Sequence, residues 1–189
     1  MKLLVVVDMQ VDFVNGALGT PEAVSIVENV VNKVKEEKEK GSQIIFTMDT
    51  HETNYLETAE GKNLPVEHCI RETAGWKLIP QLRPLTADTK IIQKPTFGST
   101  QLSYLVAIGD YDEIEIIGLC TDICVISNAL LLKATVPETP ISVDANCCAG
   151  VTPESHKKCT GSHENVPDYY QGIILSITFS LIFQISNRP

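Results

Sequence analysis

Five short segments rich in apolar residues, separated by stretches suited to helices and loops, constrain the fold of this chain most strongly. They are residues 3–7, 43–48, 90–93, 111–117 and 140–143. The first, Leu3–Val7, is apolar throughout and rich in β-branched valine, as expected of a parallel strand buried on both faces. Strands and helices alternate along the chain. We therefore predict an α/β fold, a doubly wound and mostly parallel sheet with helices on both faces.

The connections between these strands differ in kind. Valine and isoleucine recur at helical spacing across Pro21–Lys40, and Gly41 suits the position just after a helix. Thr100–Ile108 is expected to be a second helix, and Trp76–Leu82 a short helical piece. Residues 50–75 are polar and too long for a simple connector, which indicates a functional loop.

The composition excludes several classes of protein. The 189 residues suit one domain, and 43% hydrophobic with 21% charged residues is ordinary for a globular protein. A net charge of −9 argues against nucleic-acid and anionic-membrane partners. Six cysteines fit reduced thiols better than a disulfide scaffold, and the N-terminal apolar run is too short for a signal peptide. We expect a cytoplasmic protein, and the sequence leaves open a homo-oligomer.

The stretch Gly118–Val125 contains the strongest candidate for a catalytic residue. It follows a predicted strand and precedes a good helix-forming segment, so Cys124 is expected in the first turn of a helix at the carboxyl end of a central strand. A helix N-terminus favours thiolate and offers N–H groups to a developing oxyanion. The alternative is a buried structural cysteine, the usual environment of a lone free thiol.

Two further polar residues lie just past predicted parallel strands. Asp8 follows the first strand and Lys94 the third, so both are expected at the same sheet edge as Cys124. Asp8 could accept the thiol proton, and Lys94 could balance the charges of the carboxylate and thiolate. Taken singly, Asp8 could instead form a turn or cap, and Lys94 could be a solvated lysine.

A candidate metal site lies in the long polar segment. Asp49 and His51 are two residues apart, so in a continuing strand their side chains share a face, and His68 follows farther along. One carboxylate and two imidazoles suit Zn²⁺, Mn²⁺ or Fe²⁺ and leave positions for water and substrate. The alternative is that these are surface histidines.

Six motifs, in order, resemble the isochorismatase-like cysteine hydrolases and, within them, the nicotinamidase (pyrazinamidase) branch. They are VDMQVDF at 7–13, DTH at 49–51, LPVEHCI at 64–70, KPTF at 94–97, GLCTDICV at 118–125 and DANCCAG at 144–150. The likeness covers roughly residues 1 to 156, which we treat as one isochorismatase-like domain. It departs from the family at Glu72, where relatives often have glycine, so this loop is expected to be altered.

The resemblance implies roles for individual residues. It implies a triad of Asp8, Lys94 and Cys124, with an oxyanion hole formed by the backbone N–H groups of Cys120 and Cys124 and a cis peptide before Cys120. The implied metal ligands are Asp49, His51 and His68, with Glu60 as a fourth in some relatives. The implied metal is Zn²⁺, with Mn²⁺ and Fe²⁺ as alternatives. The implied apolar walls of the substrate pocket are Phe13, Leu64 and Phe97.

These implications together predict a metal-assisted hydrolase of a small amide, with nicotinamide as the expected substrate. Isochorismatases proper lack the metal ligands, which favours the nicotinamidase branch. One alternative is a metal-free hydrolase of the same fold that acts on another small substrate. A second is a non-catalytic binding protein. A third, redox chemistry at Cys120 and Cys124, is disfavoured because their spacing exceeds that of thioredoxin-like motifs.

Residues 157–189 form an atypical tail. Thr152 and Pro153 begin a predicted helix, but the stretch that follows His156 contains Gly and Pro and has no helical period. In one permitted coding of Lys157 onward, removal of a single A gives KNALEAMKMCQIIIK, which is amphipathic and strongly helix-forming. We therefore hypothesise that a one-nucleotide insertion near Lys157–Lys158 replaced the closing helix with this tail.

Overall fold

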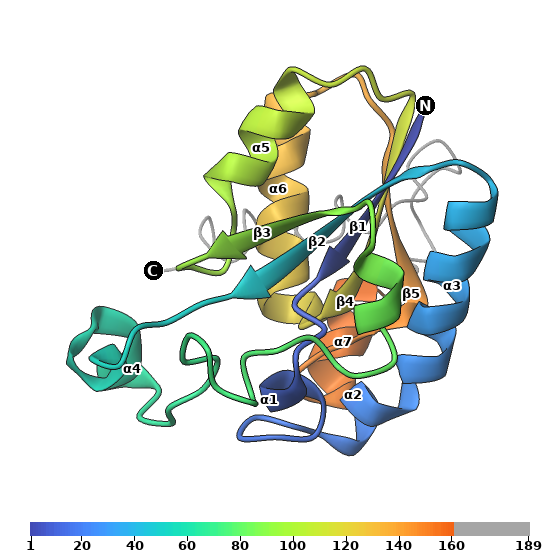
Figure 1. Ribbon diagram of the computed structural model, residues 1–189. Helices are drawn as coiled ribbons and strands as arrows, with labels where there is room; N and C mark the ends of the chain where they lie inside the picture. Colours follow the sequence, from blue (N-terminus) through green and yellow to red (C-terminus); the bar gives the residue numbers. More distant parts are fainter. Residues whose placement is uncertain (161–189) are drawn as a thin grey trace.

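A computed structural model describes residues 1–160 of the chain, as a single parallel sheet covered by helices (Figure 1). The strands are β1 (Lys2–Val7), β2 (Gln43–Asp49), β3 (Lys90–Lys94), β4 (Glu113–Leu119) and β5 (Ile141–Ala149), in the order β3-β2-β1-β4-β5. Every neighbouring pair is parallel. The predicted α/β class is confirmed.

The helices lie on both faces of this sheet. The first part of the chain forms α1 (Val11–Val14), α2 (Pro21–Ser25) and α3 (Val27–Glu39), and the second forms α4 (Ala59–Asn63), α5 (Thr100–Ala107), α6 (Ile126–Thr135) and α7 (Pro153–Thr160). Figure 1 shows α5 and α6 side by side on one face and α3 on the other. Residues Leu3 to Val7 of β1 are completely buried between these layers, which explains their uniformly apolar sequence.

The predicted helix Pro21–Lys40 is divided at Ile26 into α2 and α3. The Ile26 N–H donates to Val24 O rather than to a carbonyl four residues back, and the Ile26 side chain is buried in the core. The helical spacing of the apolar residues continues across this bend, so the sequence pattern alone does not reveal it. Gly41 ends the segment at φ +79°, as predicted.

The predicted helix Trp76–Leu82 is absent. Instead, this segment runs beside the chain that follows β1: the N–H groups of Val11 and Ile79 donate to Lys77 O and Met9 O. A 3₁₀ turn follows at Arg83–Thr86. These long-range backbone hydrogen bonds, which a local pattern cannot predict, hold residues 77–79 alongside that chain, and a turn follows at residues 80–82.

The fifth strand is longer than predicted and continues beyond Asp144 to Ala149. The Asp144 carboxylate pairs with Lys33 of α3 at 2.8 Å. At the carboxyl end, Cys148 pairs with Gly118, after an irregularity in the register of β4 and β5.

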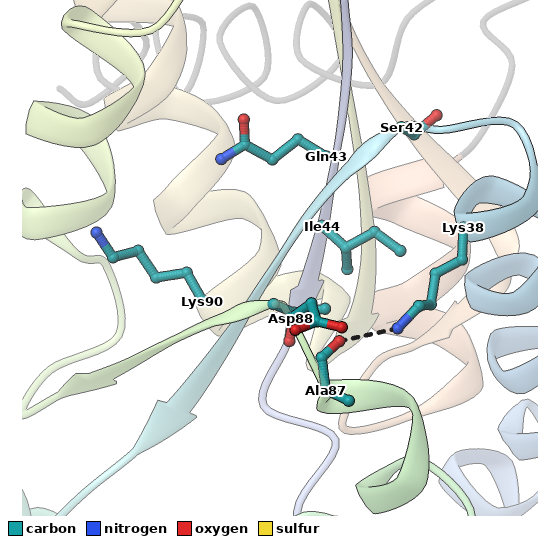
Figure 2. Close-up of a pocket in the computed structure, with 8 residues that line it drawn as sticks. Lys38, Ser42, Gln43, Ile44, Ala87, Asp88 and Lys90 are labelled. Atoms are coloured by element: carbon teal, nitrogen blue, oxygen red, sulfur yellow. Dashed lines mark hydrogen bonds between the residues drawn. The ribbon is translucent and has the colours of Figure 1, made fainter.

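The amino-terminal edge of the sheet carries a separate polar hollow of about 700 Å³ (Figure 2). There the Lys38 ammonium donates to the carbonyl groups of Leu85 and Ala87, at 2.9 and 3.0 Å. None of the predicted site residues lines this hollow. Within residues 1–160, no helix is long and apolar enough to cross a membrane.

The predicted domain end at residue 156 falls within α7. Thr152 caps this helix, since its Oγ1 accepts the Ser155 N–H at 3.1 Å, and the helix continues to Thr160. The rest of the predicted tail lies outside the described residues, so the domain division and the frame-shift hypothesis stay predictions.

Candidate active site

The predicted catalytic residues meet at the carboxyl edge of the sheet. Asp8 follows β1, Lys94 ends β3, and Cys124 lies in the turn after β4. Asp49, at the end of β2, pairs in register with Lys94. We call Asp8, Asp49, Lys94 and Cys124 the edge cluster. Parallel strands bring these side chains together because their carboxyl ends share one edge.

Lys94 is the centre of the edge cluster. Its side chain is fully buried, and its Nζ lies 2.6 Å from Asp8 Oδ2, 3.4 Å from Asp49 Oδ1 and 3.5 Å from Cys124 Sγ. Burial alone lowers the pKa of Lys94, but the negative groups of Asp8, Cys124 and Asp49 outweigh it and raise that pKa. Lys94 is therefore a buried ammonium ion and not a solvated strand-end lysine.

Asp8 is fully buried with φ +48° and receives a hydrogen bond from Thr47 Oγ1 at 2.7 Å. Burial raises the pKa of Asp8, and Lys94 only partly opposes this rise. A carboxylate whose pKa is raised accepts a proton more readily than one in water.

Burial also raises the pKa of Cys124 well above its ordinary value, with Asp8 adding to the rise and Lys94 opposing it. The residue is 4% exposed. Desolvation is therefore the largest influence on this thiol in the resting protein. The thiol needs a base, and Asp8 is the carboxylate of the cluster whose pKa is raised.

Cys124 lies in a π-helical turn, Thr121–Val125, that precedes α6, and not in the first turn of an α-helix. The Leu119–Cys120 peptide is cis, as the resemblance implies. Gly118, at φ +115°, allows this turn to approach β1, since a Cβ there would lie 2.1 Å from Val7 O. The assignment of the Cys120 and Cys124 N–H groups to an oxyanion hole stays a prediction.

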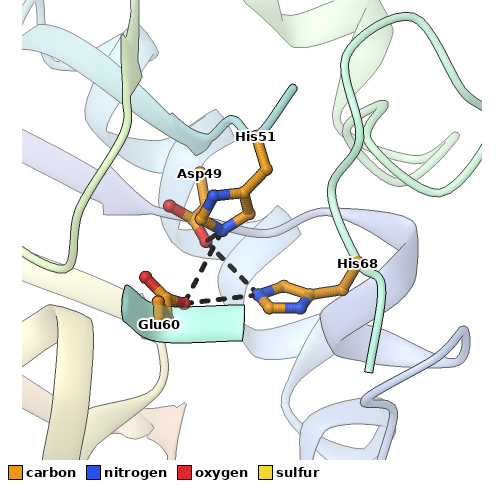
Figure 3. Close-up of side chains that lie close together, drawn as sticks. All are labelled: Asp49, His51, Glu60 and His68. Atoms are coloured by element: carbon orange, nitrogen blue, oxygen red, sulfur yellow. Dashed lines mark hydrogen bonds and ion pairs between the residues drawn. The ribbon is translucent and has the colours of Figure 1, made fainter. Parts of the chain in front are cut away.

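The four predicted metal ligands form one group, shown in Figure 3: Asp49, His51, Glu60 and His68 offer ligand atoms that all lie within 4.8 Å of one another. His51 Nε2 lies 3.0 Å from Asp49 Oδ2 and 3.7 Å from Glu60 Oε1. His68 Nε2 lies 3.7 and 3.8 Å from the same two oxygens. Both imidazoles are buried, so they are not surface histidines.

This donor set fits a divalent transition metal. Two imidazole nitrogens and two carboxylate oxygens are ligands that Zn²⁺, Mn²⁺ and Fe²⁺ accept. His68 Nδ1 donates to Val66 O at 2.8 Å, which directs the Nε2 lone pair of a neutral imidazole toward the other ligands. The Tyr55 ring packs against both imidazoles, with ring centroids 4.6 Å from His51 and 5.0 Å from His68.

Two supporting residues were not identified from the sequence. Fully buried Gln10 accepts the Asp49 N–H at 2.7 Å and donates to Asp49 O at 2.8 Å. Asp12 accepts the N–H of Cys69, the residue after His68, at 2.8 Å. Both belong to the motif that carries Asp8. Their positions in the sequence, shortly after Asp8, gave no sign that they fix the backbone beside two metal ligands.

A cavity of about 240 Å³ connects Cys124 with the candidate metal ligands. Cys120 and Cys124 line one part of it, and Asp49, Glu60 and His68 another. The predicted walls Phe13, Leu64 and Phe97 all line it. Lining residues that the sequence did not reveal come from α2 and from the segments before α2 and α7: Leu18, Thr20, Ala23, Gly150 and Val151.

Comparisons with known proteins agree with this geometry. The isochorismatase domain family matches residues 2–165. The chain is 23% identical over 188 residues to a nicotinamidase of Saccharomyces cerevisiae, covering 76% of this chain and 87% of the relative. A Bacillus subtilis protein described as an uncharacterized isochorismatase family protein, PncA, is 28% identical over 141 residues, covering 68% and 76%.

Solved structures give the same assignment. The nicotinamidase/pyrazinamidase PncA from Bacillus subtilis superposes with a TM-score of 0.71 at 26% identity, covering 82% of this chain and 90% of that one. The pyrazinamidase of Pyrococcus horikoshii in complex with zinc gives 0.70 at 27% identity, with the same coverage. The chain belongs to the isochorismatase domain family, and its similarities lie with the nicotinamidase and pyrazinamidase members.

Proposed function

We propose that this protein hydrolyses a small aromatic amide, nicotinamide, to nicotinate and ammonia through a thioester on Cys124. The observation that carries this proposal is the cavity shared by Cys124 and the candidate metal ligands. Its apolar walls suit a flat ring, and its volume of about 240 Å³ suits a small molecule. The names of the related proteins support the same substrate class.

Asp49, His51, Glu60 and His68 would hold a divalent metal, with Zn²⁺ favoured because a related pyrazinamidase was crystallised with zinc. When bound, this ion supplies a Lewis acid for the pyridine nitrogen of the substrate. Phe13, Leu64 and Phe97 then confine the ring between the metal group and the thiol.

Acylation begins when Asp8 accepts the proton of the Cys124 thiol. The adjacent Lys94 ammonium stabilises the new thiolate, which lies 3.5 Å away. The sulfur attacks the amide carbon, and the Cys120 and Cys124 N–H groups donate to the oxyanion. Each such donor typically contributes about 3 kcal/mol in the transition state. Asp8 returns the proton to nitrogen, the C–N bond breaks, and ammonia leaves.

Deacylation uses the same groups in reverse. Asp8 accepts a proton from water as the water oxygen attacks the thioester carbon, and the oxyanion occupies the same two donors. The C–S bond breaks, the sulfur regains a proton from Asp8, and the carboxylic acid leaves. The thiol and the Asp8 carboxylate return to their starting states.

Ammonia release from a matched set of amides tests the proposal. Nicotinamide and benzamide have rings of similar size, but benzamide lacks the nitrogen that would contact the metal. We expect turnover of nicotinamide to exceed that of benzamide by at least about 10-fold, as expected for loss of one polar contact in a buried site. Equal turnover of the two would remove the proposed role of the metal, and no release from either would refute the proposal.

Metal analysis separates this function from the metal-free alternative. Protein purified without chelator should hold Zn, Mn or Fe in a stoichiometric amount. Absence of all three would favour a metal-free hydrolase of the same family. All six cysteines lie within the described residues and are unpaired. Their reduced state supports our proposal of a cytoplasmic location.

A further inference from the structure

Asn128, in the first turn of α6, is fully buried, and its side chain makes three hydrogen bonds. Its Nδ2 donates to Cys124 O at 2.8 Å and to Phe97 O at 3.1 Å. Its Oδ1 accepts the Ser99 N–H at 3.0 Å. Both amide protons and one acceptor position are therefore used, and the partners belong to two different segments.

The second of these segments, residues 94–99, begins with the buried lysine of the edge cluster. Lys94 Nζ donates to Thr96 O at 3.1 Å, and the Ser99 Oγ caps α5 by accepting the Leu102 N–H at 3.1 Å. A Cβ added at Gly98 would lie 2.5 Å from the Leu131 side chain of α6. The segment 94–99 therefore packs closely against α6, the helix that follows Cys124.

Asn128 joins the two segments that supply Lys94 and Cys124. Its hydrogen bond to Cys124 O holds the turn of the thiol, and its bonds to Phe97 and Ser99 hold the segment that follows Lys94. The 3.5 Å separation between Lys94 Nζ and Cys124 Sγ depends on the relative position of these segments. Phe97 also lines the cavity.

We propose that Asn128 is a positioning residue: it holds the Lys94–Ser99 segment against the Cys124 turn and so keeps the ammonium beside the reacting sulfur. The proposal rests on the proposed role of Cys124 as nucleophile. When the link is lost, the fold is retained but the thiolate loses its nearby positive charge. Misplacement of a reacting group by about 1 Å can lower a rate on the order of 100-fold.

The test is Asn128→Leu, which is similar in size and makes none of the three hydrogen bonds. Two rates are measured at a temperature at which the variant remains folded by circular dichroism. The first is alkylation of Cys124 by iodoacetamide, followed on the Cys124 peptide by mass spectrometry. The second is kcat for ammonia release from nicotinamide. We expect both to fall by at least about 10-fold, with a smaller change in KM.

Glu37→Gln is the matched control, because Glu37 is also buried and hydrogen-bonded but lies on α3, away from the cavity. It should lower the melting temperature and leave the alkylation rate unchanged. If Asn128→Leu also lowers only the melting temperature, Asn128 is merely structural and the proposal is wrong.

Asn128→Thr tests the positioning role if the leucine variant does not fold. A helical threonine can donate to the carbonyl four residues back, here Cys124 O, but cannot reach both Phe97 and Ser99. Slow alkylation in this variant supports the proposal, and a wild-type rate overturns it. Alkylation needs no substrate, so failure of the wild-type protein to release ammonia would refute the proposed function and leave this test intact.

Discussion

Two charged clusters in this molecule contain similar residues and differ in their burial and in the balance of their charges. The edge cluster holds the carboxyl groups of Asp8 and Asp49 around the single ammonium of Lys94. On the α3 side, carboxylates and ammonium groups alternate in what we call the helix network. Its members are Lys2, Lys33, Glu37, Lys40, Glu115 and Asp144.

One carboxyl group in each cluster, Glu37 and Asp8, has a pKa shifted in the opposite direction from the other. In the helix network, burial raises the pKa of Glu37, but Ser42, Lys40 and Lys2 outweigh it and lower this pKa to about 2. In the edge cluster, burial raises the pKa of Asp8, and one lysine does not reverse the rise. Where ammonium groups match the carboxylates, as around Glu37, the carboxyl group stays ionised. Where positive charge is short, as around Asp8, the carboxylate accepts a proton more readily.

The largest expected effect is at the edge cluster. Cys124→Ala should lower kcat at least about 10³-fold, because it removes the thiol that lies beside Lys94 and Asp8 and would form the thioester. The fold and metal content of the Cys124→Ala variant should be unchanged, as measured by circular dichroism and elemental analysis. Cys159→Ser, outside the cavity, should keep full activity, and Cys120→Ser should cost far less than Cys124→Ala. Turnover above a few per cent in Cys124→Ala would remove its role as nucleophile.

His51→Ala and His68→Ala probe the metal group beside the edge cluster. Each should lower metal affinity at least about 100-fold. Loss of a residue that hydrogen-bonds to a ligand already weakens metal binding, and loss of the ligand itself should weaken it at least as much. KM for nicotinamide should rise more than the alkylation rate of Cys124 changes, because the metal positions the ring. His156→Ala is the control for metal content, as this side chain contacts Thr121 and not the metal group. Wild-type metal content in both ligand variants would defeat the assignment.

Glu37→Gln tests the helix network through the pH dependence of stability. The folded-state pKa of Glu37 is depressed to about 2, so its ion pairs stabilise the protein above its unfolded pKa of about 4.3. That stability is lost as the pH falls through the folded-state value. We expect the variant to be less stable by about 1–2 kcal/mol at pH 7. In urea unfolding this difference should shrink between pH 4.3 and 2; a difference independent of pH would contradict the ionic role.

Glu72→Gly gives the smallest effect and lies outside both clusters. Glu72 adopts φ +66°, a left-handed conformation that favours glycine, which is the residue that the family resemblance implies here. Glycine there should stabilise the protein by about 0.5–1 kcal/mol through relief of backbone strain, measured by urea unfolding at pH 7. Glu72→Ala, which keeps the Cβ, is the control and should not stabilise the protein to the same extent.

The residues of the edge cluster could be predicted because a parallel sheet collects strand ends. Asp8 and Lys94 each follow a recognisable strand, and Cys124 lies just beyond another, so their convergence follows from topology. The metal group depends on Glu60, from the short helix α4, and on His68, from the loop that follows it. Here the family resemblance, and not the spacing of the residues, indicated that they approach Asp49.

The remaining features could not be predicted because they depend on contacts between distant segments. Asn128 looks like an ordinary polar residue in a helix, and only its burial against Phe97 and Ser99 distinguishes it. The path of residues 77–79, where a helix was predicted, is set by backbone bonds to residues near Met9. The bend at Ile26 likewise leaves the apolar period of the sequence unchanged.

The central place of β1 has a consequence for folding during synthesis. This strand leaves the ribosome before β4, with which one of its edges pairs, where Val7 meets Gly118. At roughly 5–20 residues per second, that partner is made on the order of 10 s later. Until then the apolar stretch Leu3–Val7 has an unpaired edge, which is a site for aggregation. That edge is covered only when β4 emerges, just ahead of Cys124.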